Sequence, residues 1–345
     1  MYAGKFRGVS QGRNGERTVF GRMEKMLELL FQGMNQGICA FAGIIAAYVL
    51  TCVLLHFCGN LLPRDGGRDY AVDGKLSQGK PRGAGFVFIL IFALTAFVFL
   101  PLDRERSIYV ILTIAAMLTG FLDDCSKAPW GEYKKGILDL IISVMMAVTY
   151  INFNGTTLAI ACLDVQVELP TWLFGILATV LVWVSINVTN CADGVDGLSA
   201  TLTSITLMSF YFTAESTGMA EDYRYMTLLM VACLLGYLWY NATPSRMMMG
   251  DAGSRAMGLF IAVMALKSGY VLLFIPFALI LILDGGLGLL KVALLRFLKI
   301  RILKNTRTPL HDHVRKNIGW SNTQTVFKFA IIQIVIAFAT AWLIQ

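Results

Sequence analysis

Ten apolar runs separated by short polar connections constrain this chain more than any other feature. The runs cover residues 37–62, 84–101, 107–122, 136–152, 171–188, 199–213, 225–241, 253–267, 269–297 and 323–344. About 20 helical residues span a hydrocarbon core of roughly 30 Å, and most of the runs reach or approach that length. Of the 345 residues, 57% are hydrophobic and 15% are charged, which is unlike a soluble domain. The sequence therefore predicts an all-α, polytopic integral membrane protein with about ten transmembrane helices.

One run, 269–297, is longer than a membrane requires. As a straight helix it would extend about 43 Å, well beyond a hydrocarbon core. It also contains Asp284, followed by Gly285, Gly286 and Gly288. We expect this run to be bent or broken near these glycines.

Basic residues indicate the sidedness of the connections. They gather in 63–83, 123–135 and 298–322, whereas 153–170 contains no Lys or Arg and 214–224 contains one. Because short cytoplasmic loops carry the excess of Lys and Arg, the basic connections are predicted to be cytoplasmic. The net charge of +7 then reflects loops that face anionic lipid, and no nucleic-acid partner is expected.

The predicted organisation is one transmembrane catalytic domain, 37–345, after a polar and amphipathic N-terminal tail, 1–36. The tail is basic, but the predicted topology places it outside. This conflicts with the excess of Lys and Arg in cytoplasmic segments that the loops follow. The predicted cytoplasmic loops lie near 63–83, 123–135, 187–198, 242–252 and 298–322. Every unusual polar cluster of the chain falls in one of these loops.

The segment "FLDDCSK" (121–127) places two adjacent carboxylates, Asp123 and Asp124, at the end of an apolar run, with Lys127 following. Two neighbouring carboxylates near a low-dielectric boundary need a cation or a shared proton if both are to remain there. The alternative is a charged interfacial loop that only ends the helix.

The segment "NVTNCADGVDG" (187–197) carries polar side chains at every third position. These are Asn187, Asn190, Asp193 and Asp196. Neighbours in this series share a face if the segment is helical. Gly194 and Gly197 make a continued helix unfavourable and allow backbone groups to approach a ligand. The competing interpretation is a solvated, glycine-rich turn.

Two further segments contain candidate catalytic groups. Asp251 in "MMMGDAGS" precedes an apolar run, where it can cap a helix or supply an oxygen ligand to Mg²⁺. His311 and His313 lie in "TPLHDHVRK" among basic residues, a composition that suits a phosphate ligand. Zinc is a lesser alternative for these histidines, because two histidines supply too few ligands.

Taken together, these segments resemble the polyprenyl-phosphate N-acetylhexosamine-1-phosphate transferase superfamily, and within it the phospho-N-acetylmuramoyl-pentapeptide transferase family. "GFLDDCSK" resembles G-x-x-D-D-x-x-K, and "NVTNCADGVDGLSA" resembles N-x-x-N-x-x-D-G-x-D-G-L-A. "WYNATPSRMMMGDAGSRAMG" resembles W-x-N-x-x-P-A-x-x-F-M-G-D-x-G-S-L-x-L-G, and "TPLHDHVRKNIGWS" is similar to A-P-L-H-H-H-F-E-x-x-G-W. The resemblance extends from about residue 63 to the end of the chain.

The resemblance implies transfer of phospho-N-acetylmuramoyl-pentapeptide from its UDP-linked donor to undecaprenyl phosphate, which gives lipid I and UMP for peptidoglycan synthesis. It implies Mg²⁺ as cofactor, a bacterial inner-membrane location and a cytoplasmic active site, and it leaves a homodimer open. The implied catalytic residues are Asp123, Asp124, Lys127, Asp251, His311 and His313, with Asp251 as the metal ligand. The implied substrate-binding residues are Asn187, Asn190, Asp193, Gly194, Val195, Asp196, Asn241 and Met248.

Three departures from the family pattern matter. Asp312 replaces the middle histidine, and Met248 replaces the aromatic residue that stacks on uracil in relatives. The Pro-Arg of "GKPRGAG" (79–85) resembles relatives that transfer GlcNAc-1-phosphate, so that donor is the alternative. A secondary transporter is a less favoured alternative, because transporters place ionisable groups on broken helices near the midplane and only Asp284 fits that description.

Overall fold

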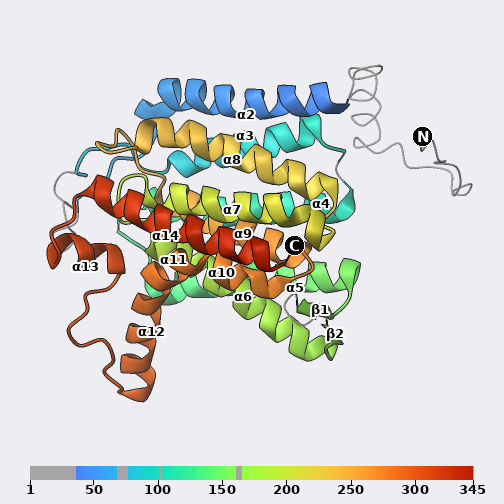
Figure 1. Cartoon of the computed structure of the whole chain (residues 1–345). Coiled ribbons are helices and arrows are strands. Elements are labelled where there is room, and N and C mark those ends of the chain that lie inside the picture. Colours follow the sequence, from blue (N-terminus) through green and yellow to red (C-terminus); the bar gives the residue numbers. More distant parts are fainter. Residues whose placement is uncertain (1–35, 68–76, 102, 127, 161–164, 345) are drawn as a thin grey trace, which may run out of the picture.

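A computed structural model describes residues 36–67, 77–101, 103–126, 128–160 and 165–344 (Figure 1). The long helices lie side by side in one bundle. They are α2 (Gln36–Cys58), α3 (Ala84–Phe99), α4 (Arg104–Asp124), α5 (Glu132–Asn154), α6 (Thr171–Cys191), α7 (Leu198–Thr217), α8 (Glu221–Asn241), α9 (Gly250–Lys267) and α14 (Asn322–Leu343). The shorter elements are η1 (Gly59–Leu61), η2 (Val271–Leu273), α10 (Phe274–Phe277), α11 (Leu279–Leu281), η3 (Ile282–Gly286), α12 (Leu287–Ala293), η4 (Leu294–Leu298) and α13 (Leu310–Lys316).

The predicted all-α, polytopic membrane fold is confirmed. Each of the ten apolar runs is helical along most of its length. Within the described residues, five helices are long and apolar enough to cross a membrane by themselves, namely α2, α4, α5, α6 and α14, and a bent pair forms a sixth candidate. Helix α3 is apolar but shorter. The number of ten crossings stays a prediction, and the tail 1–35 lies outside the described residues.

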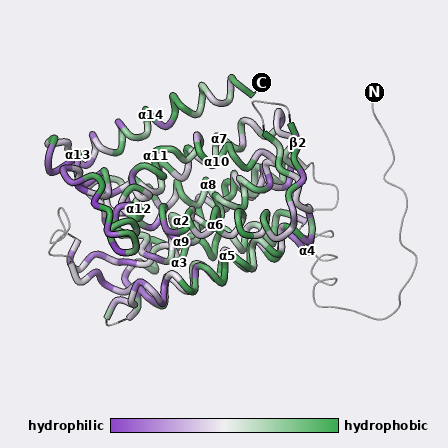
Figure 2. The backbone as a smooth tube through the Cα atoms, turned by 90° about the horizontal axis from the view of Figure 1, so that it is seen from below, coloured by the Kyte–Doolittle hydropathy of each residue, from purple (hydrophilic) through white to green (hydrophobic). Residues whose placement is uncertain are grey.

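A small β-hairpin is the one element that the all-α prediction did not contain. Strands β1 (Thr157–Ile160) and β2 (Val165–Glu168) pair antiparallel, with Thr157 opposite Glu168. The hairpin connects α5 to α6 at the end of the bundle opposite α13 (Figure 1). The hydrophilic segments of the backbone gather mostly around α12, α13 and the start of α3, where the predicted functional loops lie (Figure 2).

Helix α9 is the centre of the bundle. It packs against α3, α4, α6 and α7, and residues 250–266 are all buried. Glycines allow its neighbours to approach closely, because a Cβ on Gly258 would lie 2.5 Å from the carbonyl oxygen of Ser185 on α6. Likewise, a Cβ on Gly85 of α3 would lie 2.0 Å from the amide nitrogen of Gly253. The first turn of α9, which carries Asp251, is therefore held firmly at one end of the bundle.

The long apolar run after α9 is broken, as predicted. The segments Val271–Phe277 and Leu279–Leu298 meet at an angle of 70°. The bend lies at Ala278, directly after Pro276 and Phe277, and not at the glycines that the sequence suggested. Proline explains this position because it cannot donate the backbone hydrogen bond that continues a helix. Asp284 and its glycines form the wider helical turn of η3, and α12 then leaves the bundle (Figure 1).

The backbone groups freed by this bend are satisfied by side chains of two other helices. Gln333 of α14 is fully buried, accepts a hydrogen bond from the amide of Ile280 at 2.8 Å and donates to the carbonyl of Pro276 at 2.9 Å. Thr206 of α7 donates to the carbonyl of Phe277 at 2.7 Å. Polar backbone groups away from water need such partners, so these side chains fix the geometry of the bend.

We predict that Gln333→Leu lowers the Tm of the detergent-solubilised protein by several degrees. The substitution leaves a buried amide and a buried carbonyl unpaired, which costs on the order of 1–3 kcal/mol for each group. Phe338→Leu, on the exposed face of the same helix, is the matched control and should leave Tm nearly unchanged. Equal Tm values for the two variants would contradict this role of Gln333.

Candidate active site

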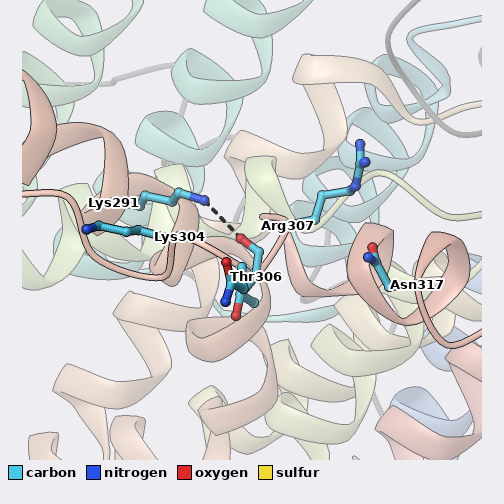
Figure 3. A pocket seen from close by; sticks show the side chains of 6 residues that line it. Lys291, Lys304, Thr306, Arg307 and Asn317 are labelled. Atoms are coloured by element: carbon cyan, nitrogen blue, oxygen red, sulfur yellow. Dashed lines mark hydrogen bonds between the residues drawn. The ribbon is translucent and has the colours of Figure 1, made fainter.

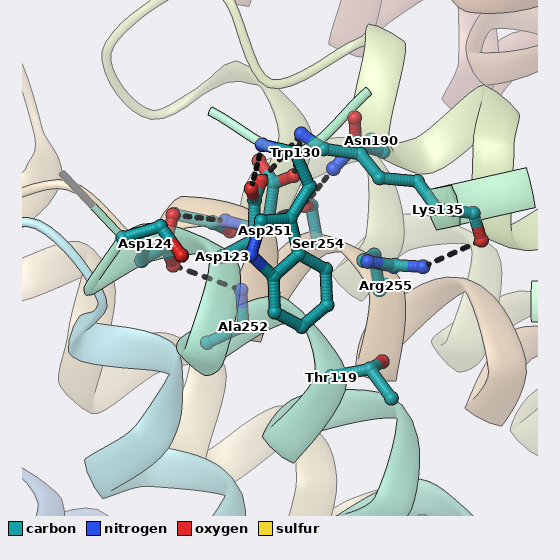
Figure 4. A network of polar contacts seen from close by, with 12 residues as sticks. Thr119, Asp123, Asp124, Trp130, Lys135, Asn190, Asp251, Ala252, Ser254 and Arg255 are labelled. Carbon is teal, nitrogen blue, oxygen red and sulfur yellow. Dashed lines mark hydrogen bonds and ion pairs between the residues drawn. The ribbon is translucent and has the colours of Figure 1, made fainter. Parts of the chain in front are cut away.

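A charge cluster lies at the end of the bundle where α9 begins. It consists of four carboxylates and two basic side chains, which come from different segments of the chain. Its members are Asp65, Arg82, Asp123, Asp124, Lys135 and Asp251. Lys135 of α5 bridges two of the carboxylates, since its ammonium lies 2.9 Å from Asp251 and also pairs with Asp123 (Figure 4). Arg82 reaches Asp251 at 3.2 Å from the α2–α3 connection. Residues separated by about 170 positions in the sequence thus contact one another.

Asp124 holds the start of α9. Its two carboxylate oxygens accept hydrogen bonds from the amides of Asp251 and Ala252, both at 3.1 Å, and Arg82 lies 2.8 Å away. A carboxylate at this place stabilises the unpaired amides and the positive end of the helix dipole. Gly250 has a φ of +69°, and a Cβ there would lie 2.2 Å from Asp124, so only glycine fits. Asp251 itself makes no capping hydrogen bond, and the capping interpretation of that residue is wrong.

Asp123 points away from Asp124 to separate partners. It accepts a hydrogen bond from the amide of Trp130 at 2.7 Å and pairs with Lys135. The exposed fractions of the Asp123 and Asp124 side chains are 3% and 0%, and both have partners on other segments, so the interpretation of "DD" as an interfacial loop that only ends the helix is wrong. Lys127 lies outside the described residues.

The electrostatics of the cluster favour bound cations. Burial disfavours the charged form of Arg82, but the carboxylates of Asp124, Asp251 and Asp65 outweigh this effect and raise the pKa of the guanidinium. The four carboxylates nevertheless outnumber the two basic groups. At 11% exposure, the side chain of Asp251 is more accessible than those of Asp123 and Asp124.

A magnesium ion fits this donor set in one particular way. Within the described residues, no three His, Cys, Asp or Glu side chains converge as a ready-made metal cage. Mg²⁺ is usually held by only one or two carboxylates, with water and substrate phosphates as the other ligands. Asp251 meets that requirement because it is the accessible carboxylate of an electronegative cluster.

The loop between α6 and α7 lies beside the charge cluster. Helix α6 ends at Cys191, and α7 begins after Gly197, whose φ is +81°, so the predicted helix termination at the glycines is confirmed. Asp196 accepts hydrogen bonds from the amide and hydroxyl of Ser245, at 3.0 and 2.8 Å, and lies 4.0 Å from Lys80. Asp193 is half-buried and contributes to the field at Arg82. These contacts connect the loop to the segments that contain Lys80 and Ser245.

Several of the predicted substrate-binding residues have structural partners. Asn241 is buried, accepts from the amide of Gly197 at 2.8 Å and donates to the carbonyl of Met247 at 2.9 Å. Asn190 donates to Ser254 at 2.9 Å, and the side chain of Val195 is buried. The amides of the two asparagines therefore position the loops.

Two other predicted substrate-binding residues contact segments that also carry members of the charge cluster. Asn187, on the last turns of α6, donates to Asp139 at 3.4 Å and to the carbonyl of Trp183 at 2.9 Å. Met248 is half-buried, and its backbone pairs with Pro81 at 2.8 Å and Ala84 at 3.1 Å. These backbone pairs keep Met248 beside the loop that supplies Arg82.

His311 belongs to the same region, whereas His313 has a different environment. Asp284 accepts from the backbone amide of His311 at 2.7 Å and lies 2.8 Å from the ring Nδ1. The other ring nitrogen faces Gly194, because a Cβ on that glycine would lie 2.2 Å from Nε2. His313 is half-buried, and its Nδ1 accepts from the amide of Arg307 at 3.3 Å.

Beside His313, a pocket opens between α12 and the end of α13 (Figure 3). It is lined by Lys291, Lys304, Asn305, Thr306, Arg307 and Asn317. The lining contains three basic residues and no acidic one, which suits an anion.

Sequence reasoning missed two central residues, Arg82 and Lys135. Lys135 was counted only as a loop charge that indicates sidedness, and Arg82, in the segment "GKPRGAG", was used only to indicate sidedness and an alternative donor. Asp65, Lys80 and Ser245 were missed as well, because nothing in their local sequence names a partner on a distant loop.

Comparison with known proteins gives the family. The model of glycosyl transferase family 4 matches residues 107–269. A phospho-N-acetylmuramoyl-pentapeptide-transferase of Treponema pallidum subsp. pallidum is 38% identical over 315 residues, which cover 86% of each chain. The chain belongs to the phospho-N-acetylmuramoyl-pentapeptide-transferase family.

More distant members of the family agree. The transferase of Clostridium perfringens is 30% identical over 75% of this chain and 81% of its own length. The transferase of Thermotoga neapolitana is 25% identical over 85% of this chain and 95% of its own length. The matched region of the family model includes Asp123, Asp124, the α6–α7 loop and Asp251.

For this family member, we predict that Gly194→Ala lowers transferase turnover roughly 10- to 100-fold, because the new methyl group must displace the ring of His311. Turnover is measured together with Tm, because the buried ring of His311 must move and a general loss of folding has to be distinguished from a local effect. Gly175→Ala is the control, since its Cβ would meet no atom closer than 3.5 Å. Wild-type turnover for Gly194→Ala would exclude a contribution of the His311 ring.

Proposed function

We propose that this protein transfers phospho-N-acetylmuramoyl-pentapeptide from its UDP-linked donor to undecaprenyl phosphate, releasing UMP and forming lipid I. The observation that supports this most directly is the convergence of the loops that carry the family motifs on one charge cluster at the bundle end. A water-soluble nucleotide sugar and a lipid phosphate can meet at such a place. The names of the relatives, which are phospho-N-acetylmuramoyl-pentapeptide-transferases, support this donor group.

Asp251 is the residue that would hold Mg²⁺, together with phosphate oxygens of the donor. The ion supplies neutralisation of the diphosphate charge and of the leaving UMP. Lys135 and Arg82 flank the same carboxylate, so their positive charges would lie beside the transferred phosphate. Phosphate oxygens are already nucleophilic, and catalysis therefore depends mainly on positioning and charge neutralisation.

Asp123 is the better candidate of the adjacent pair for accepting a proton from the acceptor phosphate. Both oxygens of Asp124 are engaged by backbone amides of α9, which cannot move aside. One oxygen of Asp123 pairs instead with the flexible Lys135, which can turn towards a phosphate. Asp124 then acts as a positioning residue for Asp251.

The uridine end of the donor is assigned to the α6–α7 loop. Asp196 would accept a hydrogen bond from the base, Asp193 lies towards the diphosphate, and Met248 covers the ring with a sulfur contact. Lys80, which lies near Asp196, adds positive charge on this side. In a bacterial cell the donor is cytoplasmic, so the proposal includes an inner-membrane location with this bundle end facing the cytoplasm.

We expect the purified protein to release UMP from UDP-N-acetylmuramoyl-pentapeptide only when undecaprenyl phosphate and Mg²⁺ are both present. UDP-GlcNAc is the second donor to test, because Arg82, part of the Pro-Arg that resembles GlcNAc-1-phosphate relatives, contacts Asp124 and Asp251. Release from UDP-GlcNAc alone would replace the proposed donor, and no release from either donor would refute the proposal.

In the same assay, Asp251→Asn should reduce turnover by about 100-fold or more at unchanged expression and Tm. The matched control is Asp222→Asn, which removes a carboxylate that pairs with Arg106 at the other end of α4. Near-normal turnover of Asp251→Asn at saturating Mg²⁺ would show that Asp251 is not the metal ligand.

Asp196→Asn should weaken UMP binding roughly 10- to 150-fold, as expected for loss of a hydrogen bond to a charged acceptor. Calorimetry in detergent measures this affinity. Asp196 also holds Ser245, so Ser245→Ala separates the two effects by removing the hydroxyl contact while keeping the carboxylate. If Ser245→Ala weakens UMP binding as much as Asp196→Asn does, the carboxylate acts through the loop and not on uridine.

A further inference from the structure

A buried ion pair lies within the bundle, one helical turn beyond Asp251 on α9. Arg255 is 2% exposed, and its Nε donates to Asp139 of α5 at 3.0 Å. One of its terminal nitrogens pairs with the same carboxylate and also donates to the backbone carbonyl of Lys135 at 3.1 Å (Figure 4). The other oxygen of Asp139 accepts from Asn187 of α6 at 3.4 Å. Helices α5, α6 and α9 are thus joined by one polar network.

This network acts on the residue that bridges the charge cluster. Lys135 is bound to α9 at both of its ends, because its carbonyl accepts from Arg255 and its ammonium pairs with Asp251. Asp139 lies four residues after Lys135 on α5, so the guanidinium contacts two consecutive turns of that helix. The guanidinium thus holds the backbone turn from which the Lys135 side chain reaches Asp123 and Asp251.

Stability alone does not account for an arginine at this place. A buried ion pair is often no more stable than well-packed apolar side chains of similar volume, because both charges lose their hydration. One terminal nitrogen of Arg255 is buried without a hydrogen-bond partner within the described residues, which adds to that cost. What arginine adds over an apolar side chain is the directional hydrogen bond to the carbonyl of Lys135.

We infer that Arg255, held by Asp139, is a positioning residue that sets where the Lys135 ammonium lies between Asp123 and Asp251. This inference rests on the proposed transferase function. Because Arg255 does not contact the cluster's carboxylates itself, its removal should act on turnover more than on donor binding.

The test compares Arg255→Leu with wild type in the UMP-release assay. We expect kcat to fall roughly 10- to 100-fold, as for a misplaced catalytic group, with less than a threefold change in KM for the donor. Arg255→Lys keeps the positive charge beside Asp139 but lacks the forked donors of arginine. Its kcat should lie between that of wild type and that of Arg255→Leu. A wild-type kcat for folded Arg255→Leu would overturn the inference.

A double-mutant cycle with Lys135→Met distinguishes positioning from general destabilisation. If Arg255 acts through Lys135, Arg255→Leu should change kcat less than twofold when Lys135 is already absent. If the loss of kcat in the double variant equals the product of the losses in the two single variants, the inference is overturned.

Two further variants control for folding. Arg255→Leu leaves the buried carboxylate of Asp139 without its ion-pair partner, so the double variant Arg255→Leu/Asp139→Leu is made to recover stability. The kcat of this double variant should remain low. Full recovery of kcat would overturn the inference. Lys267→Leu breaks another ion pair of α9, with Glu105 at 3.0 Å, at the far end of the helix. This control should lower Tm while kcat stays within twofold of wild type. Absence of UMP release from wild type itself would refute the proposed function and not the positioning role.

Discussion

The bridge from Lys135 to Asp123 and Asp251 is the interaction on which the rest of the site depends. Two carboxylates that are taken out of water near each other repel, and each favours protonation unless a cation lies between them. The ammonium supplies that cation from a third helix, and Arg82 does the same for Asp124 and Asp251 from a fourth segment. The charges are therefore compensated only when α3, α4, α5 and α9 are packed together. The site is therefore complete only in the packed bundle.

Helix α9 makes this assembly rigid. A helix that is buried on every side cannot shift without disturbing its neighbours, and close glycine contacts with α3, α4 and α6 leave little free space. Asp124 then binds the first amides of α9 through two hydrogen bonds, which fixes the direction of Asp251. On the other side, Asp284 in the broken run orients His311 beside Gly194. Because the helix is broken, Asp284 can orient His311 next to the site, and no straight helix has to pass through the site.

The sequence predicted the membrane fold and the loops of the site, but not how the loops share their charges. Apolar runs and glycine-containing breaks are local signals, so the helices, the break in 269–297 and the turn after Cys191 were accessible. Pro276 is a local signal for the bend position, whereas the expectation rested on the glycines after Asp284. The partners of the freed backbone groups were not accessible, because Gln333 and Thr206 belong to distant helices. For the same reason the sequence left Asp251 open between a helix cap and a metal ligand, whereas the structure shows that Asp124 caps α9. Lys135 and Arg82 resemble ordinary loop charges until the carboxylates beside them are known.

The kind of group that holds each carboxylate divides the cluster into fixed and exchangeable members. Asp124 is bound by main-chain amides, whose positions are set by α9, so it cannot be released when a substrate enters. Asp251 is bound by two long side chains, and a lysine or arginine can turn from a carboxylate to a phosphate at little cost. A magnesium–diphosphate complex that binds at Asp251 would bring a cation, which replaces the lysine and the arginine at the carboxylate. It would also bring an anion, to which the lysine and the arginine can then bind. In the proposed reaction, the excess of carboxylates over basic residues would therefore favour binding of the metal and the donor together.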